Sequence, residues 1–361
     1  MMKNIWKLAL MAVCAICLAA CSDNDSNNGG GEPDAIIAKS GVFILSEGNF
    51  YSGVNGDLTY YNPEDTEYTN GVFAAVNNRA LSGTANDGLV YGTKLYITNT
   101  DENVIEVVNA HTIKSIKQIE LNSARCIVAD GKYIYVTSFY GGEVAKIDTT
   151  SLEVVAKVKV EANPEGMAIL DGKLYVANSG YGIGNTVSKI DLAKFQLEEN
   201  ITVATNPAEL ITDGSRLFVL CSGKYTADYS NYEENPAIYE ILADGTTDSI
   251  AEATIATLGN DCIYLINNNY FSTSGITYTK LTLANNELST WTLTNLPFSP
   301  YAMAVNPQNG DVYITSHSSK EGDGYVYADY EGNGYTMRFD KNGSQLGQFV
   351  SGVSAGTIIF F

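Results

Sequence analysis

One short pattern recurs seven times along the chain and constrains its fold more than any other feature. It consists of an aliphatic, an aromatic and a second aliphatic residue, then a small or apolar residue and usually Ser or Asn. The copies begin at Val42, Leu95, Ile134, Leu174, Leu217, Ile263 and Val312, which are 53, 39, 40, 43, 46 and 49 residues apart. Self-similarity at a period of roughly 20–50 residues indicates a repeat fold.

Each repeat divides into four short strands. A tight turn such as Asp171-Gly172 precedes the aromatic strand, because both residues tolerate positive φ. An apolar strand such as 166–170 precedes this turn, an alternating strand such as 186–191 follows the next loop, and a polar strand such as 197–203 ends the unit. The aromatic strand is apolar on both faces, so it must lie between two layers. The pattern predicts an all-β fold, a β-propeller of four-stranded antiparallel blades.

The two ends of the repeat region complement each other. Residues 356–361 have the character of a first strand in a blade, but no blade follows them. The aromatic strand at Val42 has no apolar hairpin partner before it. We therefore expect the C-terminal strand to complete the first blade and to close a ring of seven blades, which removes the exposed sheet edges.

The N-terminus is typical of a secretory signal peptide. Lys3 and Lys7 precede an apolar run over 8–20, which is too short for a bilayer span of about 20 residues. The run ends in Leu-Ala-Ala followed by Cys21, which resembles a bacterial lipobox, so Cys21 is the expected lipidation site. The alternative is an ordinary cleavage site with a chance Cys.

The segment after Cys21 predicts a flexible tether and a location for the protein. Residues 22–31 contain no apolar side chain and cannot build a core. Their acidic residues resemble the surface-export signal of Bacteroidetes lipoproteins, which implies an outer-membrane protein facing the cell surface and held only by its lipid. The expected domains are a signal peptide (1–20), a lipidated Cys and flexible tether (21–39) and the propeller (40–361).

Charge and cysteine content exclude several classes of protein. The formal charge is −20, and removing the two lysines of the signal peptide leaves −22, which repels nucleic-acid phosphates. Beyond Cys21 the chain carries Cys126, Cys221 and Cys262, an odd number without a C-x-x-C pair. We expect buried free thiols rather than disulfides or a zinc site.

The loop after each aromatic strand varies most and is rich in Tyr, Gly, Ser and Asn. Six of the seven loops carry Tyr or Phe, and all should emerge on one face because they join equivalent strands. This composition is typical of a binding surface, although single rings could instead pack the loops onto the blades. The expected ligand-binding residues are Tyr51, Asn99, Tyr140, Tyr181, Asn185, Tyr229, Asn269, Tyr270, Phe271 and His317.

Signals for catalysis are weak. The chain has two histidines, His111 and His317, without metal-ligand spacing, and it has no G-x-S-x-G or H-E-x-x-H motif. Glu165 and Glu209 fall at corresponding inner joints of adjacent blades, where carboxylates hold calcium in some propeller hydrolases. A calcium-dependent, lactonase-like hydrolase is therefore a minor alternative, and we expect a protein that is not an enzyme and has no metal or cofactor.

The seven repeats, the joint over 163–167 (Asn-Pro-Glu-Gly-Met) and the lipobox resemble the YncE-like "surface layer" propeller lipoproteins of Bacteroidetes, over residues 40–361. Among these, the BtuG-type lipoproteins capture vitamin B12 and related corrinoids and pass them to a TonB-dependent outer-membrane transporter. The resemblance implies a corrinoid-binding cell-surface lipoprotein with such a transporter as partner. The alternative is a surface propeller that binds a protein or glycan, in adhesion or in another uptake complex.

Overall fold

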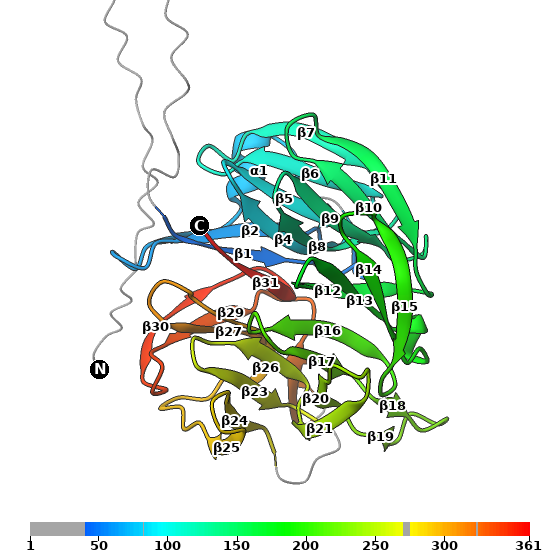
Figure 1. Ribbon diagram of the computed structural model, residues 1–361. Coiled ribbons are helices and arrows are strands. Elements are labelled where there is room, and N and C mark those ends of the chain that lie inside the picture. The colour runs from blue at the N-terminus through cyan, green and yellow to red at the C-terminus, as the bar shows by residue number, and fades with distance from the viewer. Residues whose placement is uncertain (1–39, 82, 270–274, 323) are drawn as a thin grey trace, which may run out of the picture. The chain divides into compact units, whose positions relative to one another are not determined.

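All seven aromatic strands are present in the computed structural model, which describes residues 40–81, 83–269, 275–322 and 324–361. Each is the second strand, counted outward, of a four-stranded antiparallel path. The innermost strands contact one another in the order β31, β4, β8, β12, β16, β22, β26 and back to β31. The expected seven-bladed β-propeller is confirmed, and Figure 1 shows its sheets fanning around a common centre.

Every blade contains an inner, a second, a third and an outer strand, named in that order. Blade 1 consists of β31 (Ala355–Phe360), β1 (Val42–Ser46), β2 (Asp57–Tyr61) and β3 (Tyr68–Thr69), and blade 2 of β4 (Ala85–Tyr91), β5 (Lys94–Asn99), β6 (Val104–Asn109) and β7 (Ser115–Glu120). Blade 3 consists of β8 (Ala124–Asp130), β9 (Tyr133–Ser138), β10 (Glu143–Asp148) and β11 (Glu153–Lys159), and blade 4 of β12 (Pro164–Leu170), β13 (Lys173–Asn178), β14 (Thr186–Asp191) and β15 (Gln196–Thr202). Blade 5 consists of β16 (Pro207–Thr212), β17 (Leu217–Cys221), β20 (Ala237–Ile241) and β21 (Thr247–Glu252), and blade 6 of β22 (Ile255–Leu258), β23 (Cys262–Asn267), β24 (Thr277–Thr282) and β25 (Glu287–Thr290). Blade 7 consists of β26 (Ser299–Val305), β27 (Val312–Gly322), β29 (Tyr335–Phe339) and β30 (Gln345–Val350).

The core lies between neighbouring blades. Tyr96 of blade 2 shares an apolar cluster with Ile134 of blade 3, and Tyr135 of blade 3 shares one with Leu174 of blade 4. Because the aromatic residue of the repeat buries a large apolar area against the next sheet, it joins the blades. The outermost strands are the most exposed, and β25 is exposed along its whole length. The expected gradient from apolar centre to polar rim is therefore present.

The seam closes as expected from the sequence. Strand β31 lies beside β1 in Figure 1 and pairs with it antiparallel. In this pairing Val42 lies opposite Phe360 on one side and Tyr61 of β2 on the other. Beyond the paired strands, the Gly41 N–H donates to the Phe361 carbonyl and the Phe361 N–H donates to the Gly41 carbonyl, each at 3.0 Å. The last strand of the chain is thus the inner strand of the first blade.

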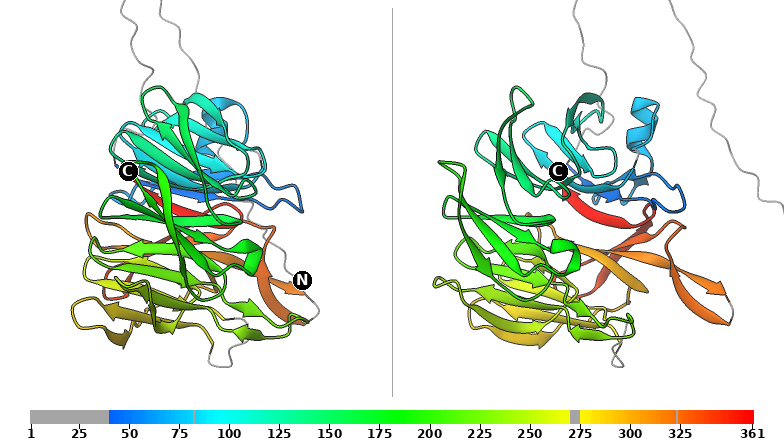
Figure 2. Two further views of the ribbon diagram at one scale, coloured as in Figure 1. Left: turned by 45° about the vertical axis from the view of Figure 1, so that its right-hand side comes forward. Right: turned by 90° about the vertical axis from the view of Figure 1, so that its right-hand side faces the viewer.

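Ordered elements replace several segments that the repeat pattern leaves as loops. A short helix, α1 (Val72–Asn77), connects blades 1 and 2 and buries Val72 and Phe73. Strand β27 runs beyond the sheet and pairs with β28 (Tyr325–Asp329) in a hairpin that projects from the ring (Figure 2). The loop of blade 5 pairs β18 (Lys224–Tyr225) with β19 (Tyr232–Glu234), and that of blade 4 contains a 3-10 turn, η1 (Gly180–Gly182). Tyr and Val favour strands once a partner strand is available, which local periodicity alone does not reveal.

The cysteines behave as expected. Cys221 and Cys262 are buried free thiols, and Cys126 is a half-buried free thiol on the wall of the central channel. Within the four described ranges, no helix has the length and apolar character required to cross a membrane.

A Gly166→Ala substitution should destabilise the joint between blades 4 and 5. A Cβ at Gly166 would lie 2.7 Å from the Ala208 carbonyl oxygen and 2.9 Å from the Glu209 Cα, both of them backbone atoms of β16. We expect a loss of about 1–3 kcal/mol of unfolding free energy, as for other overpacked positions, measured by chemical denaturation. Gly347→Ala is the control, since its Cβ would meet only the Tyr61 hydroxyl, at 3.6 Å. Equal losses for the two variants would contradict the predicted backbone clash.

Candidate functional site

The inner strands of the seven blades enclose a central channel. Each inner strand is antiparallel to the second strand, so it begins where the second strand ends; Pro164, for example, pairs with Asn178. The variable loops that follow the second strands therefore surround the end of the channel at which the inner strands begin. We call this end of the propeller the loop face. A cavity of about 480 Å³ occupies the channel, and all seven inner strands contribute to its wall.

Irregular pairing shapes the channel at the loop face. Six of the seven inner strands, all but β22, shift register near their first residues. A β-bulge breaks the alternation of side chains and turns an extra one toward a new direction. The displaced segments contain Asn86, Arg125, Glu165, Ala208 and Tyr301. The bulges thus bring polar residues to the channel wall, whose side chains would be more alike if the inner strands were regular.

Threonine hydroxyls hold the bulges in place. The Thr98 hydroxyl accepts a hydrogen bond from the Asp87 N–H at 3.0 Å, and Thr315 accepts one from the Ala302 N–H at 2.9 Å. Thr137 has the same role in blade 3. A buried N–H that left the ladder without a partner would reduce stability, so these threonines stabilise the bulges within a closed ring.

An ion pair joins two residues of the displaced segments. The Arg125 Nε lies 2.8 Å from the Glu165 Oε2, and the two side chains are 31% and 16% exposed. With its amide oriented to satisfy both polar atoms, Asn86 accepts a second hydrogen bond from the Arg125 Nη1 at 2.8 Å. The guanidinium also lies over the Phe139 ring, 5.2 Å from the centroid. Arg125 therefore connects the channel wall to the aromatic loop of blade 3.

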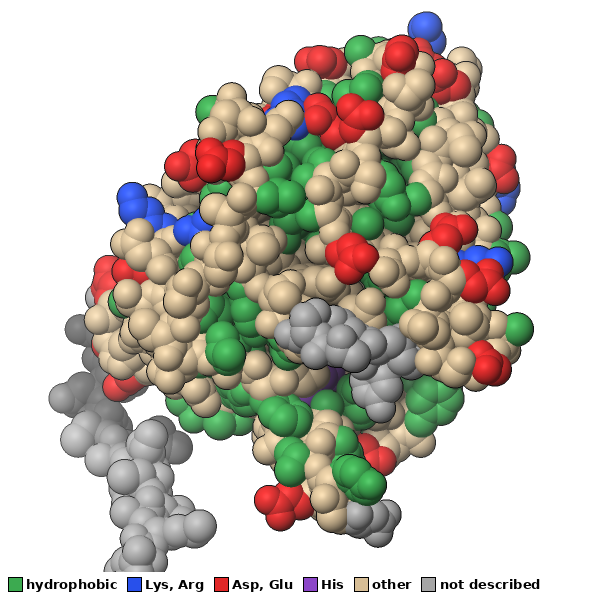
Figure 3. Space-filling view, turned by 90° about the horizontal axis from the view of Figure 1, so that it is seen from below, with side chains coloured by type: hydrophobic (Ala, Val, Ile, Leu, Met, Phe, Trp, Pro, Cys, Tyr) green, Lys and Arg blue, Asp and Glu red, His purple; other side chains and the backbone are tan. Residues whose placement is uncertain are grey.

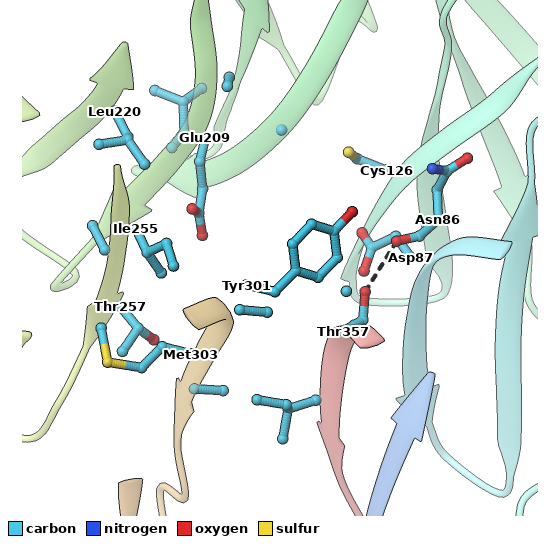
Figure 4. Close-up of a pocket in the computed structure, with 18 of the residues that line it drawn as sticks. Asn86, Asp87, Cys126, Glu209, Leu220, Ile255, Thr257, Tyr301, Met303 and Thr357 are labelled. Carbon is cyan, nitrogen blue, oxygen red and sulfur yellow. Dashed lines mark hydrogen bonds between the residues drawn. The ribbon is translucent and has the colours of Figure 1, made fainter. Parts of the chain in front are cut away.

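Asp87 and Glu209 line the channel, and Glu47 is bonded to Tyr301, another residue of its wall. The two carboxyl oxygens of Asp87 accept the Gly88 and Ile127 N–H groups at 2.7 and 2.9 Å. The Tyr301 hydroxyl donates to the Glu47 Oε1 at 3.2 Å. Glu209 projects into the channel, and no hydrogen bond from the described residues reaches its carboxyl group. Figure 4 shows the Tyr301 ring between Glu209 and Asp87.

Desolvation dominates the electrostatics of this cluster. Burial raises the pKa of Glu47 to about 7 and that of Asp87 to about 6, whereas the Glu209 side chain is exposed to the channel. Because the folded state holds these protons more tightly than the unfolded chain, the associated stabilisation is complete below about pH 4 and is lost as pH rises to about 7. At neutral pH the propeller therefore carries charges that oppose its folding, which is more common at functional sites than elsewhere.

The predicted tyrosines of blades 3 and 4 form one exposed platform on the loop face. Tyr140 and Tyr181 are 67% and 73% exposed, and the Phe139 ring lies 4.9 and 6.1 Å from their ring centroids. Tyr181 has a positive φ of 57°, so its backbone is held in the left-handed region. The structure brings these two predicted residues together around a ring, Phe139, that also contacts Arg125.

Other predicted aromatic residues occupy separate loops of this face. Tyr51 in blade 1 is 96% exposed and Tyr229 in blade 5 is 75% exposed. Tyr229 also lies near Tyr225, with ring centroids 6.0 Å apart. The β27–β28 hairpin adds Tyr325 and Tyr327, which the sequence places in the same segment as His317 without marking them as ligand-binding residues.

The remaining predicted residues differ in their accessibility. His317 is buried between the Tyr301 and Tyr330 rings, each 4.8 Å from its own, and burial lowers the pKa of His317. Asn99 is buried, and its side-chain oxygen accepts the Glu102 N–H at 3.4 Å, whereas Asn185 is exposed and Asn269 is half-buried. Tyr270 and Phe271 lie outside the described residues.

Figure 3 shows one face of the molecule in space-filling form. Hydrophobic side chains gather there in recesses among uncharged ones, while Asp, Glu and the fewer Lys and Arg lie mainly nearer the rim. Exposed rings that occur singly are ordinary, but rings gathered around one hollow are typical of binding sites.

The carboxyl groups do not form a metal centre. Within the described ranges, no group of three His, Cys, Asp or Glu side chains is arranged to hold a metal ion. Glu165 and Glu209, the pair behind the calcium-dependent alternative, have different surroundings, because Arg125 pairs with Glu165 alone. Calcium requires six to eight oxygen ligands around one point.

The sequence between residues 40 and 331, which is more than half of the chain, matches a domain of unknown function, DUF5074. The chain belongs to the DUF5074 family. Among curated proteins, none matches the sequence significantly.

Solved structures share the propeller fold with this DUF5074 chain. A proposed 6-phosphogluconolactonase of Bacteroides uniformis has a TM-score of 0.64 at 8% identity, over 89% of this chain and 99% of its own. One from Bacteroides fragilis has a TM-score of 0.63 at 11% identity, over 91% and 100%. The hydrazine synthase of Kuenenia stuttgartiensis has a TM-score of 0.54 at 17% identity, over 75% and 96%. At these identities the likeness concerns the fold alone.

Sequence reasoning did not identify most of the channel site in this DUF5074 protein. Asp87, Arg125 and Tyr301 were not predicted, and Glu209 was considered only as a possible calcium ligand. One available signal was a polar or charged residue placed one to three positions into each inner strand, accompanied in blades 2, 3 and 7 by a Thr of the second strand, Thr98, Thr137 or Thr315. That signal becomes meaningful only when the bulges are known.

Proposed function

We propose that this protein is a cell-surface lipoprotein that captures a bulky nutrient on its loop face, with vitamin B12 or a related corrinoid as the favoured ligand. A TonB-dependent outer-membrane transporter would receive the ligand. The observation that carries the proposal is the set of exposed aromatic side chains on loops of several blades around one channel opening.

The chemistry of a corrinoid suits such a surface. Its large, nearly flat ring offers apolar area that tyrosine rings can cover, and its edge carries amides that hydrogen-bond to Asn side chains and loop backbone. Tyr140 and Tyr181 come from different blades and share contact with Phe139, so together they could cover part of such a ring. Neutral amides require little positive charge from the protein, which agrees with a formal charge of −20.

The sequence supports the proposed location. The lipobox ending at Cys21 and the acidic, apolar-free segment after it resemble those of an exported lipoprotein, and the YncE-like resemblance covers the blades that the structure describes. Several acyl chains on Cys21 would anchor the protein firmly, since each buried CH₂ contributes about 0.8 kcal/mol.

Calorimetry with cyanocobalamin tests the proposal. We expect the full chain, purified in detergent without added metal, to bind it with a Kd in the micromolar range or tighter. Tyr140→Ala and Tyr181→Ala should each weaken binding about 30-fold, equivalent to about 2 kcal/mol for a central aromatic contact. Both rings are mostly exposed, so the melting temperature should change little.

Leu288→Ala is the matched control, because Leu288 is a 44% exposed apolar residue on the outer strand of blade 6. It should leave both affinity and stability unchanged. Absence of any heat or thermal stabilisation with several corrinoids at micromolar protein would reject the corrinoid. Full affinity in both tyrosine variants would instead place the site away from this platform.

A further inference from the structure

The aromatic residue of the repeat is buried in every blade except blade 4. Its side chain is at most 3% exposed in six copies, which are Phe43, Tyr96, Tyr135, Phe218, Tyr264 and Tyr313. The seventh copy, Tyr175, is only half-buried. A cavity of about 500 Å³ lies beside it, between blades 4 and 5. This volume is within the range of about 300–1,000 Å³ that is typical of small-molecule sites.

The cavity is present where one turn lacks a side chain. In blades 2, 3 and 4 the turn between the third and fourth strands contains an apolar residue with positive φ. These residues are Ile113, Leu152 and Phe195. Each shares an apolar cluster with the aromatic residue of the preceding blade. In blade 5 the residue with positive φ in this turn is Gly245, so the turn offers no such side chain to cover Tyr175.

The junction of blades 3 and 4 shows what fills the corresponding space. The Phe195 ring lies there with its centroid 5.8 Å from that of Tyr135, and the Lys146 ammonium lies 5.4 Å from the Phe195 centroid. Lys146 is the cross-strand neighbour of Tyr135. Lys189 has the same position beside Tyr175 in blade 4, and both residues line the cavity. Blade 4 therefore supplies the same two partners for a ring that the chain itself does not provide.

The charges of the cavity wall select among aromatic ligands. The wall contains four carboxyl groups and two cations, so its net charge is about −2. Lys189 already forms an ion pair with Glu199 at 2.9 Å. Arg216 forms one with Glu240 at 2.5 Å. An anionic ligand would be repelled, whereas a neutral ligand that donates a hydrogen bond would find acceptors in the excess carboxylates.

We propose that the cavity between blades 4 and 5 is a binding site for a neutral aromatic compound of the phenol class. Its ring would pack against Tyr175, in the place that Phe195 occupies at the neighbouring junction, with Leu217 and Ile241 as further apolar wall. An aromatic pair of this kind is favourable beyond the apolar area that it buries. The phenol hydroxyl is a hydrogen-bond donor, and a carboxylate of the wall such as Asp171 is an acceptor.

This site is separate from the corrinoid site proposed above and does not depend on it. Asp171 lies in the turn between the inner and second strands of blade 4, and Gly245 lies in the turn between the third and fourth strands of blade 5. Both turns are at the ends of the strands opposite to the loop face. The platform of Tyr140 and Tyr181 is on the loop face, so the two ligands would bind at opposite ends of the propeller.

The test is calorimetry of the full chain in detergent with 4-methylphenol, which is the side chain of tyrosine, and a titration into detergent alone is the blank. We expect a Kd of about 1 mM or tighter. The anion 4-methylbenzoate has the same ring and should bind at least about 10-fold more weakly at pH 7. Tyr175→Ala should weaken the binding of 4-methylphenol about 5-fold, because it removes the aromatic partner.

Gly245→Phe supplies the missing ring from the chain itself and should block the site. A Cβ at Gly245 would meet no atom within 4 Å, and Phe195 shows that a phenylalanine tolerates positive φ in this kind of turn. We expect 4-methylphenol to bind this variant at least about 10-fold more weakly. Gly92→Phe is the matched control, since Gly92 also has positive φ and open surroundings but lies in blade 2. It should bind as the parent chain does.

Several results would overturn the proposal. They are the absence of heat above the blank at about 10 mM 4-methylphenol, equal binding of 4-methylbenzoate, and unchanged affinity in a Gly245→Phe chain that melts like the parent chain. Equal weakening in Gly92→Phe and Gly245→Phe would also contradict a site at this junction. If Gly245→Phe folds poorly, Tyr175→Ala decides alone, and unchanged affinity in that variant rejects the site.

Discussion

Removal of Thr357–Phe361 should open the ring and remove most of the stability of the propeller. These residues form most of β31, the inner strand of blade 1, and bury Ile358 and Ile359. Burial of each isoleucine contributes about 1.5–3 kcal/mol, so the two together represent about 3–6 kcal/mol of a total stability that is typically 5–15 kcal/mol. The deletion also leaves one edge of β1 without hydrogen-bond partners.

Thermal unfolding followed by circular dichroism measures this effect. We expect the truncated chain to melt at a much lower temperature, or to show no cooperative transition. A chain without residues 1–34 is the control and should melt like the full chain, because every described strand lies after them. A synthetic peptide of residues 355–361 should restore part of the lost stability. Equal melting temperatures of the truncated and full chains would disprove the closure of the ring by β31.

Arg125→Met should produce the second large loss of stability. It removes the partner of Glu165 and leaves a carboxyl group that is only 16% exposed without its ion pair. Breaking a fully buried pair costs 3–5 kcal/mol, and the partial exposure of Arg125 reduces our expectation to about 2–4 kcal/mol. Burial already raises the pKa of Glu165 and Arg125 opposes that rise, so the variant should lose more stability at pH 8 than at pH 5.

A double variant separates the lost charge from the lost packing. Arg125→Met with Glu165→Met replaces both charges by apolar side chains of similar length, which is often neutral for a buried pair. We expect the double variant to recover most of the stability at pH 8. If it were as unstable as the single variant, the role of Arg125 would lie in its contact with the Phe139 ring rather than in the ion pair. Chemical denaturation at both pH values provides the measurement.

The blades could be predicted because the information for them is local. The aliphatic-aromatic-aliphatic pattern around Tyr96 or Tyr135 indicates that both faces of the strand are buried. An Asp-Gly pair indicates the position of the turn between two strands of a hairpin. The seam at β31 required only a comparison of the two ends of the chain. None of these inferences depends on the positions of residues in other blades.

The channel site could not be predicted in the same way, because it depends on closure. Glu47, Asp87, Arg125 and Glu209 come from four blades, and each stands in an ordinary polar-apolar context along the chain. These residues lie near one another only because the inner strands contain bulges and the blades close into a ring. His317 shows the reverse case, since its loop position suggested exposure, but the Tyr301 and Tyr330 rings enclose it.

The position of β1 also determines how the propeller responds to a mechanical load. The described chain begins next to Gly41, at the end of β1 opposite to the loop face, and β1 is paired on both edges with β2 and β31. A pull on the N-terminal segment, resisted by a ligand on the loop face, therefore acts along the axis of β1. Because the hydrogen bonds of antiparallel strands lie perpendicular to the strands, both ladders are loaded in shear and must yield together rather than one bond at a time.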